Sequence, residues 1–230
     1  MKRILITGAS RGIGRAIAEK LAAPDTMLLL QGRDASALDE TKRFVEKRET
    51  KAESFTCDLS KPADIAKLIA QLGSASLDTL INNAGIAVVK PIDAVLLEEW
   101  QRTLAVNVTA PFLLTQGLVP KMPSGASIVN ILSIAAKTGF GGWSSYCMSK
   151  FALEGFSQSL REEVRPRGIR VINIYPAATA TEIWNGVEGE WPRDKMMSAQ
   201  EVADAVSYAL GRPADVAVEN ITLSSMSGTL

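Results

Sequence analysis

Short apolar runs alternate along the chain with longer segments whose apolar residues recur at helical spacing. The runs predict strands at 3–7, 26–31, 52–57, 79–82, 127–131, 171–175 and 219–223. Several of them, such as 4–6 and 27–30, are apolar without a break. This is typical of strands that are covered on both faces in a parallel sheet.

Helical patterns fill the gaps between these runs. Ile13, Ile17 and Leu21 recur every four residues, as one face of a helix requires. Similar patterns predict helices at 35–48, 62–72, 98–118, 146–164 and 199–210, the last with a capping box of Ser198 and Glu201. Strand and helix alternate without a linker, so we expect a single α/β domain over residues 1–230. Its sheet should be doubly wound, parallel and seven-stranded, with helices on both faces.

Composition narrows the possible chemistry. Among the 230 residues, 25 Lys and Arg balance 25 Asp and Glu, and histidine is absent. Ser-His-Asp catalysis and His-ligated metal sites are therefore excluded, and Cys57 and Cys147 do not form a CxxC pair that could hold a metal. Zero net charge argues against nucleic acid or a membrane as a partner. Without a signal peptide or a long apolar stretch, we expect a soluble, cytoplasmic protein.

A glycine-rich turn follows the first strand. Residues 7–14 read TGASRGIG, and Gly8, Gly12 and Gly14 give the spacing GxxxGxG rather than GxGxxG. Glycines at such a turn let the backbone approach a pyrophosphate, and the helix N-terminus supplies amide donors. We therefore expect a dinucleotide to bind at Gly8, Ser10, Arg11, Gly12, Ile13 and Gly14.

Further motifs follow in a regular order. The sequence Asn-Asn-Ala-Gly at 82–85 ends the fourth strand, Tyr146 and Lys150 form a YxxxK motif, Ser133 precedes that tyrosine, and Asn107 lies in an Asn-Val-Thr segment. Together with the glycine loop, these motifs resemble the short-chain dehydrogenase/reductase family through nearly the whole chain. The resemblance implies a Rossmann fold and hydride transfer between a nicotinamide cofactor and a carbonyl or alcohol.

Charge after the second strand predicts which cofactor binds. In the family this position discriminates the cofactors, and here it holds Arg33, while Arg11 is a second cation of the kind found in NADP-dependent members. A guanidinium suits a 2′-phosphate because its fork donates two hydrogen bonds. Asp34 lies near the place of an NAD-binding acid but beyond the discriminating position, so NADP(H) is the predicted cofactor. By resemblance, the remaining contacts are Asp58, Leu59, Asn83, Ala84, Gly85, Tyr146, Lys150, Pro176, Thr179 and Thr181.

The catalytic residues also come from the resemblance. It implies that Tyr146 donates a proton to the substrate oxygen, Ser133 hydrogen-bonds that oxygen, Lys150 binds the nicotinamide ribose, and Asn107 holds a relay water. Residues four apart lie on one helix face, and a nearby ammonium should lower the pKa of the phenol from its usual value. The family pattern is not matched everywhere, since Ala177 replaces the usual glycine after Pro176.

The leading hypothesis is therefore an NADPH-dependent carbonyl reductase. A 3-oxoacyl-carrier-protein reductase is one alternative, since Arg165, Arg167 and Arg170 could dock an acidic carrier, although a solvated helix end is the preferred interpretation. Pteridine and sugar reductases also remain open. A dinucleotide-sensing protein is the non-enzymatic alternative, because a fold alone does not establish a function.

Two features bear on the substrate and on assembly. Residues 181–197 are expected to form a substrate lid hinged near Gly186 and Gly189, and Phe140, Trp143 and Trp184 to line an apolar pocket for a bulky or aromatic ketone. The alternative is that these large side chains only pack onto the domain. The helix at 98–118 is apolar nearly all round, so we expect a homodimer or homotetramer.

Overall fold

The computed structural model describes residues 1–187, 189, 191–213 and 215–228. Within them, parallel strands form one seven-stranded sheet in the order β3-β2-β1-β4-β5-β6-β7, which confirms the doubly wound α/β fold. The chain crosses from β3 to β4, on the other side of β1, and this switch point is where such sheets bind ligands. The strands are β1 (Lys2–Ile6), β2 (Thr26–Gly32), β3 (Lys51–Thr56), β4 (Thr79–Asn82), β5 (Ser127–Ile131), β6 (Arg170–Pro176) and β7 (Asn220–Leu223).

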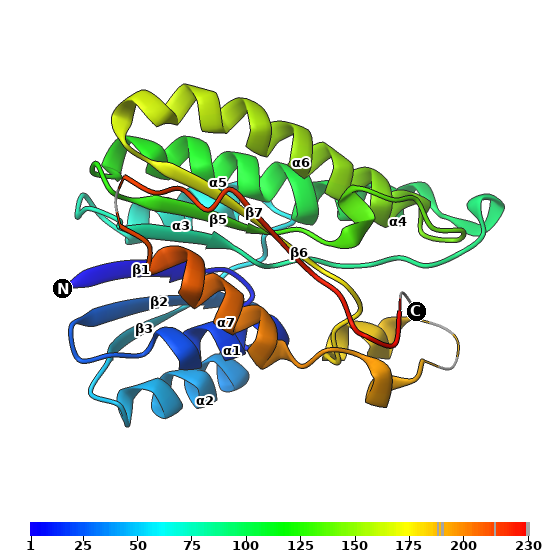
Figure 1. The fold of residues 1–230 in the computed structure, drawn as a ribbon, viewed down its shortest axis with the longest axis horizontal. Coiled ribbons are helices and arrows are strands. Elements are labelled where there is room, and N and C mark those ends of the chain that lie inside the picture. The colour runs from blue at the N-terminus through cyan, green and yellow to red at the C-terminus, as the bar shows by residue number, and fades with distance from the viewer. Residues whose placement is uncertain (188, 190, 214, 229–230) are drawn as a thin grey trace.

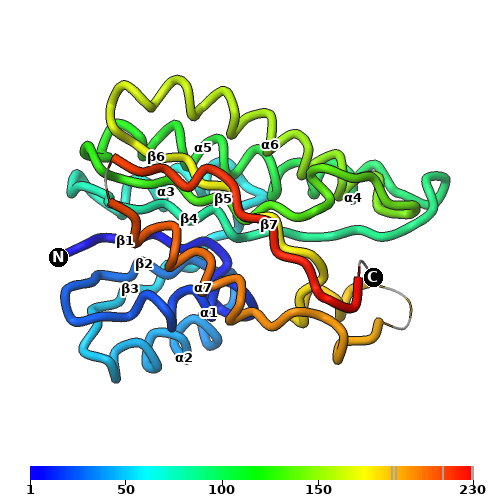
Figure 2. The backbone as a smooth tube through the Cα atoms, in the orientation of Figure 1, coloured from blue at the N-terminus to red at the C-terminus, as the bar shows by residue number. Residues whose placement is uncertain are grey.

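Helices cover the sheet in two layers (Figure 1). One layer holds α1 (Gly12–Leu21), α2 (Ala35–Glu46) and α7 (Ala199–Leu210), and the other holds α3 (Pro62–Gln71), α5 (Ala110–Leu118) and α6 (Ser144–Val164). The backbone trace shows the N-terminus at the start of β1 and the C-terminal segment beyond the end of β7 (Figure 2). In the described part of the chain, no helix is long and apolar enough to cross a membrane.

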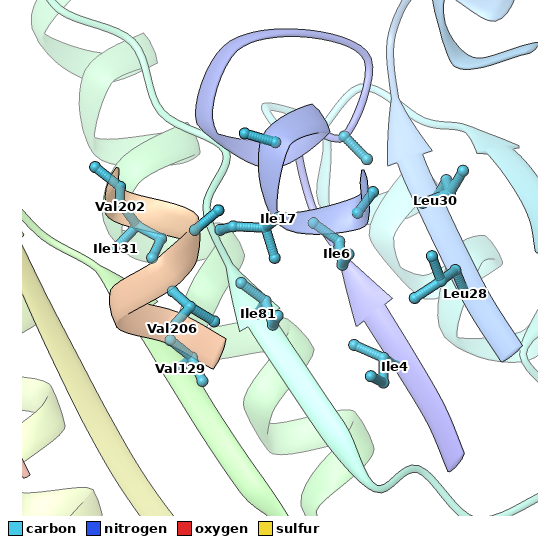
Figure 3. Packing of buried hydrophobic residues seen from close by; sticks show 14 of the residues in the cluster. Ile4, Ile6, Ile17, Leu28, Leu30, Ile81, Val129, Ile131, Val202 and Val206 are labelled. Atoms are coloured by element: carbon cyan, nitrogen blue, oxygen red, sulfur yellow. The ribbon is translucent and has the colours of Figure 1, made fainter. Parts of the chain in front are cut away.

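Two apolar clusters fill the space between sheet and helices. In Figure 3, Ile4 and Leu28 from adjacent strands pack in the cluster that also includes Ile17 of α1 and Val206 of α7. On the other face, Leu5 and its neighbours pack against α3, α5 and α6. Alternate residues of β2, β4, β5 and β6 thus point to opposite faces and are buried on both, as the unbroken apolar runs predicted, whereas the edge strands β3 and β7 have exposed residues.

The predicted helix at 98–118 is present, but it is not α-helical throughout. It consists of α4 (Leu97–Leu104), a π-helical segment (Ala105–Thr109) and α5. Asn107 lies in the π segment with 1% of its surface exposed, and its side-chain amide accepts from the backbone N–H of Ile86 and donates to the carbonyl of Ile86, both at 2.9 Å. The wider turn directs this amide toward the loop after β4, and π segments are frequent at functional sites.

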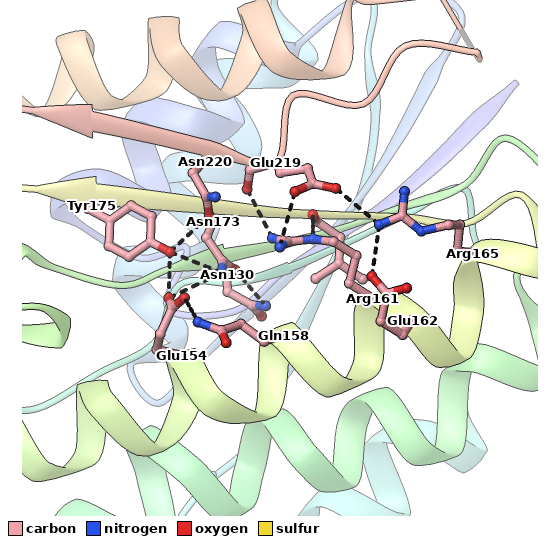
Figure 4. A network of polar contacts seen from close by, with 11 residues as sticks. Asn130, Glu154, Gln158, Arg161, Glu162, Arg165, Asn173, Tyr175, Glu219 and Asn220 are labelled. Carbon is pink, nitrogen blue, oxygen red and sulfur yellow. Dashed lines mark hydrogen bonds and ion pairs between the residues drawn. The ribbon is translucent and has the colours of Figure 1, made fainter.

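Four asparagines lie side by side across the sheet. Asn82 of β4, Asn130 of β5, Asn173 of β6 and Asn220 of β7 are successive partners in the strand register. The side-chain amide of Asn82 donates to Asn130 Oδ1 at 2.8 Å. The side-chain amide of Asn130 donates to Asn173 Oδ1 at 3.3 Å, and Figure 4 shows these two residues. This ladder aligns the strands whose carboxyl ends carry the candidate site.

Helix α6 is attached to the last two strands by polar contacts (Figure 4). Glu154 accepts a hydrogen bond from the hydroxyl of Tyr175, whose pKa is raised by burial. About two turns further along the helix, Arg161 pairs with the Glu219 carboxylate at 3.4 Å and donates to the Glu219 carbonyl at 3.2 Å. The helix that carries the YxxxK motif is therefore held in a defined position on β6 and β7.

Candidate active site

Glycines shape the turn between β1 and α1. Gly8 and Gly12 have φ angles of +65° and +54°, a region that L side chains rarely adopt. A Cβ on Gly14 would lie 2.2 Å from the carbonyl oxygen of Gly8, so only glycine lets the helix approach the loop this closely. The open backbone at the start of α1 is a cradle that fits a phosphate group.

The segment after β4 braces this loop from one side. The side-chain amide of Asn83 donates to the carbonyls of Thr7 at 2.8 Å and Gly8 at 3.3 Å. In return, the hydroxyl of Thr7 accepts from the backbone N–H groups of Asn83 at 2.9 Å and Ala84 at 3.0 Å. The Asn83 side chain thus supports the phosphate loop itself, a role that the motif alone did not reveal.

Gln31 braces the loop from the other side, and sequence reasoning missed it. Its side chain, 1% exposed at the end of β2, accepts from the backbone N–H of Gly8 at 3.1 Å and donates to the carbonyl of Cys57 at 2.8 Å. One amide thereby joins the phosphate loop to the end of β3. The signal available was a polar residue inside an otherwise apolar strand.

A cleft of about 930 Å³ runs along the carboxyl ends of β1 to β4. The structure brings most of the predicted cofactor residues together in its walls. It adds Gln31, Ile86, Ala87 and Val106, which the sequence did not single out. The predicted residues that line it are Gly8, Ser10, Arg11, Gly12, Ile13, Arg33, Asp58, Leu59, Asn83, Ala84, Gly85 and Thr181.

Positive charge is available at the β2 end of this cleft. Arg11 and Arg33 both line it, and neither guanidinium forms a hydrogen bond or an ion pair within the described residues. Asp34 is engaged elsewhere, because its carboxylate caps α2 by accepting from the backbone N–H of Ala37 at 3.1 Å. The lining therefore fits a dinucleotide with a further phosphate on its adenosine ribose.

Asp58 has local partners of its own. Its carboxylate accepts from the backbone N–H of Ser60 at 3.0 Å and from the Ser60 hydroxyl at 2.8 Å. These hydrogen bonds, with smaller contributions from Lys61 and Arg33, hold its pKa below the usual value. Contact with an adenine ring stays a prediction for this residue.

Tyr146 and Lys150 lie one turn apart on α6, as their spacing predicted. The Lys150 ammonium is 5.6 Å from the centroid of the tyrosine ring, but it donates a hydrogen bond to the carbonyl of Ile131 at 2.8 Å. The expected lowering of the tyrosine pKa is not found. Burial raises the pKa of Tyr146 to about 12 and lowers the pKa of Lys150 to about 8, because desolvation penalises each charged form.

Ser133 stands beside the tyrosine. It follows β5 and caps a short 3₁₀ helix (Ile134–Ala136), accepting from the backbone N–H of Ala135 at 3.1 Å. The nearby Ser133 side chain partly offsets the rise in the tyrosine pKa. Two hydroxyl groups therefore converge at one point, at the carboxyl edge of the sheet.

Lys150 and Asn107 lie behind this pair. A Cβ on Gly85 would lie 3.5 Å from Asn107 Oδ1 and 3.8 Å from Lys150 Nζ, so both groups flank the same glycine. Asn107 also donates to the hydroxyl of Ser149 at 3.0 Å. Neither Lys150 nor Asn107 is among the lining residues of a cavity described here, in contrast to Ser133 and Tyr146.

A second cavity, of about 110 Å³, adjoins the cleft and shares Ala87, Thr181 and Ile183 with it. Trp184 is 9% exposed and packs with Val187 and Met196, so the packing alternative describes part of its role. It also lines the cavity. The predicted residues that this cavity brings together are Ser133, Phe140, Trp143, Tyr146, Pro176, Thr179, Thr181 and Trp184.

The predicted lid at 181–197 borders both cavities. Residues 188 and 190 lie outside the described residues, and the rest includes two 3₁₀ helices, Glu182–Gly186 and Arg193–Lys195. Arg193 connects them by donating to the carbonyl of Thr181 at 3.1 Å and to Asn185 Oδ1 at 2.8 Å. In Figure 1 the C-terminal segment runs beside this region, where Ser225 donates to the carbonyl of Lys195 at 2.8 Å. Hinges near Gly186 and Gly189 stay a prediction.

The chain is similar to known proteins in both sequence and fold. The sequence model described as short chain dehydrogenase matches residues 2–190. A sepiapterin reductase from Chlorobaculum tepidum is 33% identical over 100% of this chain and 99% of its own length. A 3-oxoacyl-[acyl-carrier-protein] reductase from Aquifex aeolicus is 33% identical over 89% of this chain and 88% of its own. The crystal structure of a short chain dehydrogenase from Burkholderia cenocepacia in complex with NADP superposes with a TM-score of 0.88, at 30% identity, over 97% of this chain and 96% of that one.

Proposed function

Because this chain belongs to the short-chain dehydrogenase family, we propose that it is an NADPH-dependent carbonyl reductase in which Tyr146 is the proton donor. The observation that carries the proposal is the convergence of the Tyr146 and Ser133 hydroxyls in a cavity that adjoins the dinucleotide cleft. As a family member the chain is an oxidoreductase that acts on alcohol or carbonyl groups, and its cofactor is NADP(H).

Residues of the cleft and of the adjoining cavity would bind three parts of the cofactor. The amide groups at the start of α1, after Gly12, would bind the pyrophosphate, and Arg11 and Arg33 the 2′-phosphate. Pro176 and Thr179, at the end of β6, would contact the nicotinamide beside Tyr146. When bound, the reduced cofactor supplies the hydride. The NADP-bound solved relative supports the choice of cofactor.

Side chains of this protein would donate the proton and stabilise the negative charge that develops on the substrate oxygen. A phenol with a raised pKa remains protonated at neutral pH, so Tyr146 can donate its proton to the substrate oxygen. Ser133 would donate a hydrogen bond to the same oxygen as charge builds up on it. Lys150 would bind the nicotinamide ribose, and Asn107, held on the Ile86 backbone, would retain the water that returns a proton toward Tyr146.

The test is a screen of ketones and aldehydes with NADPH, in which the loss of cofactor absorbance measures turnover. We expect turnover on part of the panel and a higher kcat/KM with NADPH than with NADH. Tight NADPH binding without any turnover would instead support the sensor. The screen also separates the reductase classes, because a sugar or pteridine substrate would stand out against simple ketones.

Of the enzymatic alternatives, carrier-protein docking through the arginines of 165–170 has little support. Arg165 pairs with Glu162 at 2.9 Å and Glu219 at 3.2 Å, and Arg167 and Arg170 donate to backbone carbonyls. They lie at the end of α6 and the beginning of β6, whereas the candidate site is at the strands' carboxyl ends. A pteridine reductase is the alternative that a relative's name favours.

Assembly and organisation complete the proposal. Phe112 on α5 and Phe151 on α6 are 42% and 46% exposed, which supports a homodimer or homotetramer that buries these helices. The whole chain would act as one NAD(P)-binding domain with 181–197 as its lid. A cytoplasmic location stays a prediction from the sequence.

A further inference from the structure

The cavity beside Tyr146 contains hydroxyls but no charge. Apart from indole N–H groups, its polar lining side chains are those of Ser133, Tyr146, Thr179 and Thr181, and no acidic or basic side chain lines it among the described residues. Thr179 is engaged, because its hydroxyl donates to the carbonyl of Ala177 at 3.0 Å. The remaining hydroxyls are those of Ser133 and Tyr146, where the carbonyl would bind, and that of Thr181, which also lines the dinucleotide cleft.

Aromatic rings form the part of the cavity wall next to Tyr146. The ring of Trp143 stands edge-on to Tyr146 and to Trp184, with centroids 5.6 Å apart in both pairs, and to Trp191 at 6.0 Å. Trp184 is fixed in place, since its indole N–H donates to the carbonyl of Thr179 at 2.8 Å and its ring lies 4.8 Å from that of Trp191. A cluster of mutually inclined aromatic rings thus lies next to Tyr146.

We infer that this cavity selects uncharged ketones that carry an aromatic ring, an inference that rests on the carbonyl reductase activity proposed above. A ketone with an aromatic ring should have a kcat/KM about fivefold higher than one with an aliphatic ring of equal size, because ring–ring contacts contribute about 1 kcal/mol beyond burial. A carboxylate on that ring would find no counter-ion in the lining, and a polyol would leave its hydroxyls unpaired.

The experiment compares ketones whose carbonyl groups are chemically equivalent. With NADPH, kcat/KM is measured for 4-phenyl-2-butanone, for 4-cyclohexyl-2-butanone, and for the phenyl ketone with a para-carboxylate group. We expect a preference of about fivefold for phenyl over cyclohexyl, and a loss of more than about 100-fold for the carboxylate. Equal values for phenyl and cyclohexyl, or a preferred charged ketone, overturn the inference while leaving the reductase proposal intact.

Variants of the wall locate the selectivity. Trp184→Leu should reduce the phenyl-to-cyclohexyl ratio to near one, while Trp184→Phe, which keeps a ring, should retain most of it. Trp100→Leu on α4 is the matched control, since Trp100 does not line the cavity, and its ratio should equal that of the wild type. A ratio that survives Trp184→Leu contradicts the assignment of the wall. Absence of turnover on every ketone overturns the proposed function and this inference together.

Discussion

The ammonium of Lys150 donates its hydrogen bond to the carbonyl oxygen of Ile131, at 2.8 Å, at the end of β5. This contact anchors the catalytic helix to the central sheet. Burial, rather than an interaction between Tyr146 and Lys150, dominates the pKa values of both residues. Keeping the buried lysine charged therefore costs the folded state free energy, because the ammonium loses its hydration.

That cost predicts a dependence of stability on pH. The pKa of Lys150 is lowered from 10.5 to about 8, so between these pH values the unfolded chain binds more protons than the folded one. The penalty is complete below pH 8 and is relieved as the pH rises. From pH 7 to pH 9 the wild type should gain about 1.4 kcal/mol in unfolding free energy relative to Lys150→Met. Urea unfolding at both pH values measures this, and the comparison cancels groups common to both proteins. Parallel pH profiles for the two proteins would contradict the lowered pKa.

Tyr146→Phe should abolish carbonyl reduction and leave NADPH binding nearly intact. The substitution removes only the hydroxyl, and with it the proton donor that meets Ser133. Turnover is followed by NADPH absorbance and binding by its fluorescence. Tyr208→Phe on the exposed side of α7 is the matched control and should behave like the wild type. Retention of more than about a tenth of the wild-type kcat would show that another group supplies the proton.

The sequence predicted the parts of the site that depend on local spacing. Tyr146 and Lys150 share a helix face because they are four residues apart, and the glycine-rich turn leads into a helix that begins at Gly12. Contacts between strands were not predictable in this way. The asparagine ladder depends on register, and the π segment around Asn107 depends on a single widened turn that hydrophobic periodicity does not resolve. The tyrosine pKa depends on burial, which no spacing reports.

Arg33→Ala should shift cofactor preference toward NADH. The guanidinium lines the cleft without an ion pair in the described chain, so its loss removes a charge-assisted contact to the 2′-phosphate of about 1.5 to 3 kcal/mol. The ratio of kcat/KM for NADPH over NADH should therefore fall by roughly 10- to 100-fold. Arg43→Ala, on the exposed surface of α2, is the control and should leave the ratio unchanged. An unaltered ratio in Arg33→Ala would place the 2′-phosphate elsewhere.

Gln31→Met tests whether one buried amide positions the phosphate loop. Methionine has a similar length but can neither accept from the N–H of Gly8 nor donate to the carbonyl of Cys57. The unpaired groups cost about 1 to 3 kcal/mol, and the loop loses its link to the end of β3, so the Kd for NADPH should rise about tenfold. The KM for the ketone should not change.

A control separates this effect from general destabilisation. Ser157→Ala removes a buried hydroxyl that accepts from Asn130 at 2.9 Å. Ser157 lies on α6, in the helix layer on the opposite face of the sheet from α1 and the phosphate loop. It should lower Tm by a similar amount and leave the NADPH Kd at the wild-type value. If Gln31→Met lowers Tm as the control does but binds NADPH with unchanged affinity, Gln31 stabilises the fold without positioning the loop.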